Sequence, residues 1–175
     1  MKKTLIQAFH PQPERSRVQR AWLERLSHAP GLTINRLYER YPDWRIDIER
    51  EQQLLVSHER IVFMHPLYWY SVPPLMKLWM DEVLTFGWAY GPGVETLKGK
   101  DWLQALSTGA SADDYQAGGF NEYSLSELMK PLQRTAAMLG MRYQALFVLD
   151  GVRQRDDEAL RQSAERLLAR LSGED

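Results

Sequence analysis

Three adjacent aromatic residues follow a buried-looking apolar run. The segment HPLYWYS, residues 65–71, places Tyr68, Trp69 and Tyr70 directly after RIVFM at 60–64. Flat, mostly uncharged faces beside backbone N–H groups suit a planar, hydrogen-bonding ring system better than a sugar or a charged metabolite. The alternative is a place in the core or in a dimer contact. Because three neighbouring side chains do not all face one core, the sequence favours a ring-binding loop.

A second loop, HPQPERS at residues 10–16, leads into a helical pattern. Ser16 and Gln19 form a capping-box pattern at its start. The free N–H groups and the positive dipole end of a helix N-terminus make an anion site, to which Arg15 or Arg17 adds charge. The alternative is that Ser16 only caps the helix and that the arginines are solvated. Spacing alone leaves both interpretations open.

A third loop, STGASADDYQAGGFN at residues 107–121, begins with small polar residues. Ser107, Thr108 and Gly109 follow an apolar run directly, so their hydroxyl and N–H groups are expected near the edge of a bound ring. A Thr-Gly pair also occurs in ordinary turns, which makes it weak evidence by itself.

Alternating strands and helices are the predicted framework of these loops. The apolar runs lack polar alternation, which is typical of parallel strands covered by helices on both faces. We therefore predict one α/β domain over residues 1–175, a flavodoxin-like doubly wound sheet of five parallel strands in the order 2-1-3-4-5. The three loops then meet at the carboxyl ends of the strands. The predicted strands lie at 4–9, 32–38, 60–64, 102–107 and 143–149.

The segments between these apolar runs have helical patterns. The first helix follows Ser16, and the third begins at Pro73 or Pro74, because proline suits the first helical turn. Pro131 lies inside the fourth pattern, so we expect a kink or a late start there. The remaining predicted helices span about 48–58, 125–139 and 156–171.

Composition excludes several functions. The formal net charge of -1 and the pI near 6.4 offer no basic field for nucleic acid or for an anionic membrane. There is no cysteine, which excludes disulfides, thiolate metal sites and cysteine nucleophiles. His10 and His65 each precede a proline but belong to no metal-ligand spacing, and no glycine-rich nucleotide motif is present, so we predict no metal site. The N-terminal apolar run is too short for a signal peptide, and no run approaches the roughly 20 apolar residues of a membrane span, so we expect a cytoplasmic protein.

Nearly the whole chain resembles a known family. The matching segments are HPQPERS after the first strand, LYERYPDWRIDIEREQQLL at 37–55, HPLYWYSVPPLMKLWMDEVLTFGWAYG at 65–91, LKGK at 97–100 and STGASADDY after the fourth strand. These segments are similar to the short flavodoxin-like NAD(P)H quinone oxidoreductases, and most closely to the ancillary flavoproteins of glutathione-regulated bacterial potassium-efflux systems.

The resemblance implies a non-covalent flavin, FMN, with FAD as the alternative. It implies that the first loop holds the flavin phosphate, that the aromatic loop and the third loop line the isoalloxazine, and that Tyr115 lies near the flavin N1 and O2 end as the catalytic residue. Trp69 and Tyr70, with Trp88 and Tyr90, are expected to wall a slot for flat substrates, although simple loop packing is the alternative for Trp88 and Tyr90. The implied cofactor-binding residues are His10, Ser16, Val18, Gln19, Pro66, Leu67, Tyr68, Trp69, Tyr70, Ser107, Thr108, Gly109, Ala110 and Tyr115.

Two positions depart from the family pattern. Ala110 stands where relatives usually have glycine, so it lacks the freedom to take positive φ. Asn121 stands where larger quinone reductases have a histidine, and an asparagine carries no proton through an ionised form. If the activity is present, Tyr115 or solvent must serve instead.

The activity implied is two-electron, ping-pong hydride transfer from NAD(P)H through the flavin to a quinone. An alternative is a regulatory subunit that activates a membrane potassium-proton antiporter, alone or in addition to catalysis, which would place the protein at the inner membrane through that partner. A weaker alternative is an azo- or nitro-reductase. Because the flavin sites of relatives lie at a two-fold interface, we expect a homodimer.

Overall fold

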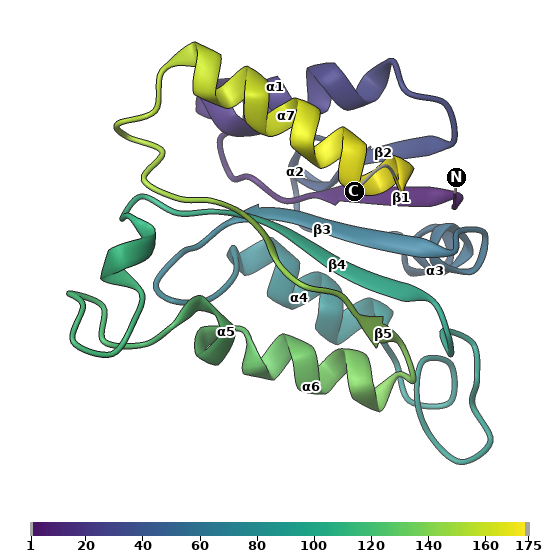
Figure 1. The fold of residues 1–175 in the computed structure, drawn as a ribbon. Helices are drawn as coiled ribbons and strands as arrows, with labels where there is room; N and C mark the ends of the chain where they lie inside the picture. The colour runs from purple at the N-terminus through teal and green to yellow at the C-terminus, as the bar shows by residue number, and fades with distance from the viewer. Residues whose placement is uncertain (1, 174–175) are drawn as a thin grey trace.

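A parallel sheet forms the centre of the computed structural model, which describes residues 2–173 (Figure 1). Six strands fill five positions in the order β2-β1-β3-β4-β5, and β6 also pairs with β4, so the predicted order 2-1-3-4-5 is confirmed. The strands are β1 (Thr4–Ala8), β2 (Leu32–Arg36), β3 (Arg60–Pro66), β4 (Asp101–Ser107), β5 (Arg142–Tyr143) and β6 (Phe147–Leu149).

Helices cover both faces of this sheet, as Figure 1 shows. On one face α1 and α7 pack through Trp22 and Leu167, and on the other α3, α4 and α6 contribute Leu55, Trp79 and Ala136. All five of these side chains are buried, which explains why the strands are apolar on both faces. The helices are α1 (Arg17–Ser27), α2 (Leu37–Arg40), α3 (Ile48–Val56), α4 (Pro74–Val83), α5 (Leu125–Leu128), α6 (Lys130–Met138) and α7 (Asp157–Ser172), with short 3-10 turns η1 (Pro13–Arg15) and η2 (Ala112–Asp114).

The fifth position of the sheet differs from the single strand predicted at 143–149. Tyr143 pairs with Trp102 and Phe147 pairs with Ala105, so four steps along the fifth strand oppose three along β4. The extra residue makes a bulge, which divides the predicted strand into β5 and β6.

Two other predicted elements, one strand and one helix, have different bounds in the structure. The second predicted strand ends at Arg36, because Leu37 already begins α2. The fourth predicted helix divides at Met129, and Pro131 lies in the first turn of α6, where its missing N–H costs no intrahelical bond. The helical pattern therefore begins at Leu125 as predicted, but it breaks at Met129 and restarts at Lys130, which is neither a simple kink nor a late start.

A buried carboxylate ties several of these elements together. Glu51 on α3 is 0% exposed and accepts hydrogen bonds from side chains of β1, β2, α4 and the loop after α2. Because every oxygen has donors, the buried charge is satisfied. We define the Glu51 cluster as Glu51 with its donors Gln7, Asn35, Tyr41, Arg50 and Trp79.

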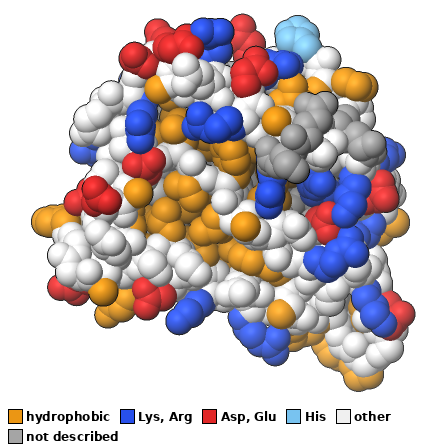
Figure 2. All heavy atoms as spheres, viewed as in Figure 1, with side chains coloured by type: hydrophobic (Ala, Val, Ile, Leu, Met, Phe, Trp, Pro, Cys, Tyr) orange, Lys and Arg blue, Asp and Glu red, His pale blue; other side chains and the backbone are white. Residues whose placement is uncertain are grey.

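Figure 2 shows hydrophobic side chains gathered across the middle of one face, between the α1/α7 layer and the α4/α6 layer, where the edge of the sheet lies. Among residues 2–173, no helix combines the length and apolarity that crossing a bilayer requires.

Candidate functional site

A cavity of about 590 Å³ opens at the carboxyl ends of the strands. The parallel winding brings the loops after β1, β3 and β4 together there, as the switch-point rule for such sheets requires. A fourth loop, after β6, joins them. The cavity is lined by His10, Arg15, Ser16, Arg17, Val18, Pro66, Leu67, Tyr68, Trp69, Ser107, Thr108, Gly109, Val152 and Arg153.

The N-terminus of α1 forms one wall of this cavity. The Ser16 hydroxyl oxygen accepts the Gln19 N–H at 3.1 Å, so Ser16 caps the helix and lines the cavity at the same time. The N–H groups of Arg17 and Val18 lie in the first turn, where a helix offers them no acceptor. The two interpretations of Ser16 are therefore compatible, and the wall has the character of an anion site.

His10 follows β1 and is partly buried beside Tyr68, with the two ring centres 6.3 Å apart. Its Nδ1 accepts the Gln12 N–H at 3.1 Å, which leaves the proton of the neutral ring on Nε2. Burial lowers the pKa of His10, against smaller opposing effects of Gln12 and Glu14. The ring therefore stays neutral near pH 7 and offers an Nε2–H donor.

The aromatic loop is a strained two-residue turn. Tyr68 and Ser71 exchange backbone hydrogen bonds of 3.1 and 2.9 Å, and between them Trp69 and Tyr70 have φ angles of 47° and 61°. Two successive positive φ angles normally require Gly or Asn, and each costs about 1 to 3 kcal/mol in a bulky residue. The Trp69 side chain is 92% exposed, so packing in the core does not offset this strain.

The strain leaves two backbone donors available. The Leu67 N–H donates to the Ser107 carbonyl at 2.8 Å, and the Tyr68 N–H is used within the turn. Among the described residues, the N–H groups of Trp69 and Tyr70 have no acceptor.

Backbone hydrogen bonds join the loop after β4 to the loop after β6. The Thr108 N–H donates to Leu149, and the N–H of Gly151 donates to Ala110. The Thr108 hydroxyl donates to the Ala110 carbonyl at 2.8 Å, so it holds the loop instead of pointing freely at a ring edge. Within the described chain the N–H groups of Gly109 and Ala110 remain unpaired.

Arg153 and Val152, on the loop after β6, were not predicted. The Arg153 Nε lies 3.6 Å from the position that a Cβ on Gly109 would occupy. Their segment, DGVRQRD, looks like an ordinary charged loop in the sequence. The signal that finds them is topological, because the fifth strand also ends at this edge.

Several predicted residues lie beside the cavity without lining it. The Tyr70 hydroxyl donates to the Asn121 side-chain oxygen at 3.2 Å, which links the aromatic turn to the loop after β4. Burial, together with nearby Tyr70 and Asp114, raises the pKa of Tyr115, so its phenol stays protonated at neutral pH. Gln19 is buried and lines a much smaller adjoining space.

Trp88 and Tyr90 are not brought to the cavity of their own chain. α4 runs back from the carboxyl ends of the strands, so the loop 84–91 begins near their amino ends (Figure 1). There the two side chains pack against the core beside α4, and Phe86 contacts Tyr90 edge-on. Within one chain they follow the loop-packing alternative.

The comparisons with known proteins agree with this architecture. A family model described as a flavodoxin-like fold matches residues 2–171. An uncharacterized NAD(P)H oxidoreductase of Bacillus subtilis, YdeQ, is 48% identical over 170 residues, which are 97% of this chain and 86% of that protein. The chain belongs to the flavodoxin-like NAD(P)H oxidoreductase family.

Other members of this family carry more specific names. The glutathione-regulated potassium-efflux system ancillary protein KefG of Erwinia tasmaniensis is 40% identical over 93% of this chain and 88% of its own length. General stress protein 14 of Treponema denticola, solved in complex with FMN, has a TM-score of 0.93 and 37% identity over 98% of each chain. An NADPH-quinone reductase from P. pentosaceus has a TM-score of 0.88 and 30% identity over 95% of this chain and 96% of its own.

The residues of this member are chemically suited to a flavin. The first loop offers helix N–H groups and the Arg15 side chain to a phosphate, and the other loops offer N–H donors at Trp69, Tyr70, Gly109 and Ala110. A volume of about 590 Å³ is within the roughly 300 to 1,000 Å³ usual for such ligands.

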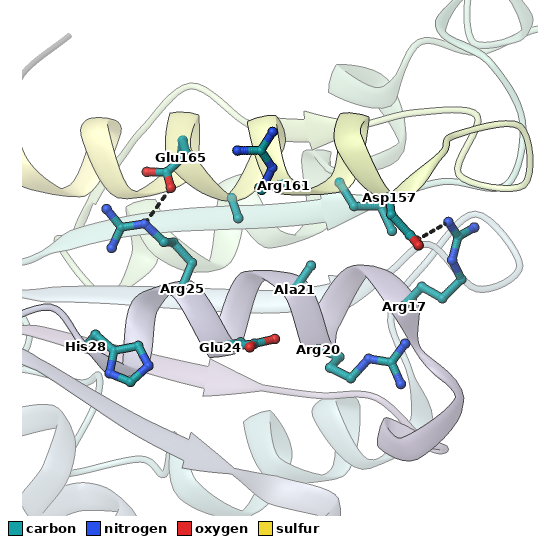
Figure 3. Close-up of a pocket in the computed structure, with 11 residues that line it drawn as sticks. Arg17, Arg20, Ala21, Glu24, Arg25, His28, Asp157, Arg161 and Glu165 are labelled. Carbon is teal, nitrogen blue, oxygen red and sulfur yellow. Dashed lines mark hydrogen bonds and ion pairs between the residues drawn. The ribbon is translucent and has the colours of Figure 1, made fainter.

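A second hollow, of about 460 Å³, lies between α1 and α7. Figure 3 shows its charged walls, where Arg17 pairs with Asp157 at 2.6 Å and Arg25 pairs with Glu165 at 2.7 Å. These cations already have partners, and the groove runs along the helices away from most of the strand-end loops, so it is not the candidate site. Between residues 2 and 173 no three His, Asp or Glu side chains are grouped to hold a metal ion.

Proposed function

We propose that the protein is a flavin-dependent NAD(P)H:quinone oxidoreductase that binds FMN, with FAD as the alternative, in the strand-end cavity. The observation that carries this proposal is that three loops bring unused backbone N–H groups to one cavity. Those of Arg17, Val18, Trp69 and Gly109 belong to residues that line it, and those of Tyr70 and Ala110 lie beside it. Main-chain donors spaced in this way suit a ligand with a phosphate at one end and a polar-edged ring at the other.

The proposed cofactor-binding residues divide by loop. His10, Ser16, Val18 and Gln19 surround the phosphate, and Arg15 balances its charge, since Arg17 already pairs with Asp157. On the ring side, the aromatic turn supplies stacking faces and donors, and the loop after β4 supplies the opposite edge. The ring-side residues are Pro66, Leu67, Tyr68, Trp69, Tyr70, Ser107, Thr108, Gly109, Ala110 and Tyr115.

The bound flavin would supply the redox chemistry, taking a hydride from NAD(P)H and then delivering two electrons to a quinone. The protein's own part is to position the reactants. The Trp69 and Tyr70 faces form one wall of a slot for flat, apolar molecules. The neutral Tyr115 phenol serves as a hydrogen-bond donor toward negative charge at the ring, and Asn121 holds Tyr70 in place instead of relaying a proton.

A homodimer completes this slot. Exposed aromatic side chains lie on both regions that this assembly would join: Trp69 at 92% and Phe120 at 87% on the strand-end loops, and Phe86 at 70% on the loop after α4. We propose that the loop carrying Trp88 and Tyr90 walls the slot of the other subunit. Sedimentation velocity at micromolar concentration tests the assembly, and a monomer would refute this part of the proposal.

The activity is tested by reconstituting the purified protein with FMN or FAD. NADH or NADPH oxidation is then followed with a series of benzoquinones. Turnover that depends on both flavin and quinone supports the proposal. A protein that binds neither flavin, or that binds one but oxidises neither nucleotide, refutes it.

A regulatory role is the second candidate, favoured by the 40% identity to an ancillary protein of a potassium-efflux system. It is compatible with catalysis. Pull-down against the cytosolic domain of an efflux antiporter, combined with potassium-efflux measurements in a deletion strain, tests it. Absence of both binding and altered efflux excludes this role.

A further inference from the structure

His65 lines the small space that adjoins the candidate site, and its side chain is almost fully buried. The side chain, on β3, is 2% exposed, and both ring nitrogens have partners. Nδ1 lies 2.9 Å from the Pro66 carbonyl oxygen, and Nε2 lies 3.1 Å from the side-chain oxygen, Oε1, of Gln104 on β4. The side-chain nitrogen of Gln104 lies 3.0 Å from the Tyr143 hydroxyl oxygen on β5. Three strands therefore contribute to one line of polar groups.

The Pro66 carbonyl and the charge state of His65 determine which atoms in this line carry protons. The Pro66 carbonyl is only an acceptor, so Nδ1 carries a proton. Burial lowers the pKa of His65, which keeps the ring neutral and leaves Nε2 as an acceptor. With Nε2 as an acceptor, the Gln104 oxygen placed against it makes no hydrogen bond. A half-turn of the amide exchanges its oxygen and nitrogen in the same space, and we assign this orientation, in which the NH₂ group donates to His65 and the oxygen faces Tyr143.

Tyr143 is the outer end of this line. Burial raises its pKa to about 12, so the phenol stays protonated, and its hydroxyl donates to the Gln104 oxygen in the assigned orientation. Each member now donates to the next: Tyr143 to Gln104, Gln104 to His65, and His65 to the Pro66 carbonyl. Gln104 is itself 0% exposed, so water does not compete for these bonds.

The last acceptor belongs to the peptide that begins the aromatic loop. His65 holds the carbonyl of the Pro66–Leu67 peptide, and the Ser107 carbonyl holds its N–H at 2.8 Å. This peptide is therefore clamped at both ends, immediately before the strained turn that exposes the Trp69 and Tyr70 N–H groups. A strained conformation persists only where its surroundings enforce it.

We propose that Tyr143, Gln104 and His65 are positioning residues, a buried hydrogen-bond chain that fixes the Pro66–Leu67 peptide and so aims the backbone donors of the aromatic turn at the bound ring. The inference rests on the proposed flavin site and adds the residues that hold its geometry without touching the ligand.

The test joins two measurements on the full-length protein. Long-range ¹H–¹⁵N NMR of the histidine rings, without added flavin, reports the His65 tautomer, and fluorescence titration with FMN reports the dissociation constant. The variant is Tyr143→Phe, which removes the first donor. The matched control is Tyr41→Phe, which removes a phenol of similarly raised pKa from the Glu51 cluster.

We expect the Nδ1–H tautomer in the wild type and a mixture in Tyr143→Phe. The dissociation constant for FMN should rise about fivefold in Tyr143→Phe, the effect of roughly one net hydrogen bond. In Tyr41→Phe it should not change, even though the fold is weakened. His65→Gln gives a second reading, with a similar or larger rise.

Two results would overturn the inference in different ways. Equal FMN affinity in the wild type and Tyr143→Phe, with His65 as the Nε2–H tautomer, removes the chain but leaves the flavin site standing. A wild type that binds no FMN removes the proposed function, and the positioning role falls with it.

Discussion

The Glu51 cluster and the aromatic turn use polar groups in opposite ways. In the cluster, a carboxylate that is 0% exposed receives hydrogen bonds from five side chains, so every cost of burial is compensated locally. In the turn, Trp69 and Tyr70 have strained backbone and exposed rings, and among the described residues their backbone N–H groups have no acceptor. The difference separates a region that stabilises the fold from one whose cost is expected to be recovered on binding.

The largest effect is expected from Glu51→Ala. It leaves buried donors on α4, β1 and β2 without their acceptor, and we expect unfolding free energy to fall by about 3 kcal/mol. Urea denaturation followed by circular dichroism measures it, with exposed Glu49→Ala on the same helix as the control. A loss below that of the control would show that the cluster is not a structural centre.

Two buried tryptophans test how much a hydrogen bond to Glu51 contributes to stability. Trp79 and Trp102 are both fully buried and both pack on Phe63, but the Trp79 Nε1–H donates to Glu51 at 3.0 Å. The Trp102 Nε1–H finds no acceptor among the described residues. We expect Trp79→Phe to cost about 1 kcal/mol more than Trp102→Phe in the same denaturation experiment. Equal losses would assign both effects to packing alone.

The aromatic turn should respond in the opposite direction. Trp69→Gly relieves a positive φ angle at little packing cost, so we expect stability to rise by about 0.5 kcal/mol while FMN affinity and quinone turnover fall. Phe120→Gly is the control, because Phe120 is equally exposed and has no positive φ. Destabilisation of both variants would contradict stored strain at the turn.

The smallest effect concerns pH. The pKa of His10 is lowered in the folded protein, so the unfolded chain binds more protons below pH 6.5. Stability is therefore lost as pH falls from about 7 toward the folded pKa, and His10 contributes a small part of this loss. His10→Asn should flatten the slope but not remove it, because His58 and His65 are shifted in the same direction. An unchanged slope would show that His10 titrates as it does in the unfolded chain.

Periodicity and winding predicted most of the architecture. Apolar runs located the strands, and the strand order then placed residues 10–16, 65–72 and 107–121 at the carboxyl ends of the strands. This worked because topology, unlike side-chain contact, follows from the order of the elements.

Features that depend on tertiary contacts could not be predicted from the sequence. The turn at Trp69 and Tyr70 contains no glycine or asparagine to indicate it, and Glu51 has the sequence context of a charged residue on a helix surface. The bulge that divides β5 from β6 appears only when the register against β4 is known. Trp88 and Tyr90 share a long motif with the aromatic loop, but α4 carries them away from it.

One measurement tests the central claim most directly: a ¹H–¹⁵N correlation spectrum of the protein titrated with FMN. The account predicts saturable shifts at the backbone amides of residues 16–18, 67–70, 108–110 and 152–153, with the Glu51 cluster and the α1/α7 groove unchanged. Shifts confined to that groove, or no saturable shift anywhere, would contradict a flavin site at the strand ends.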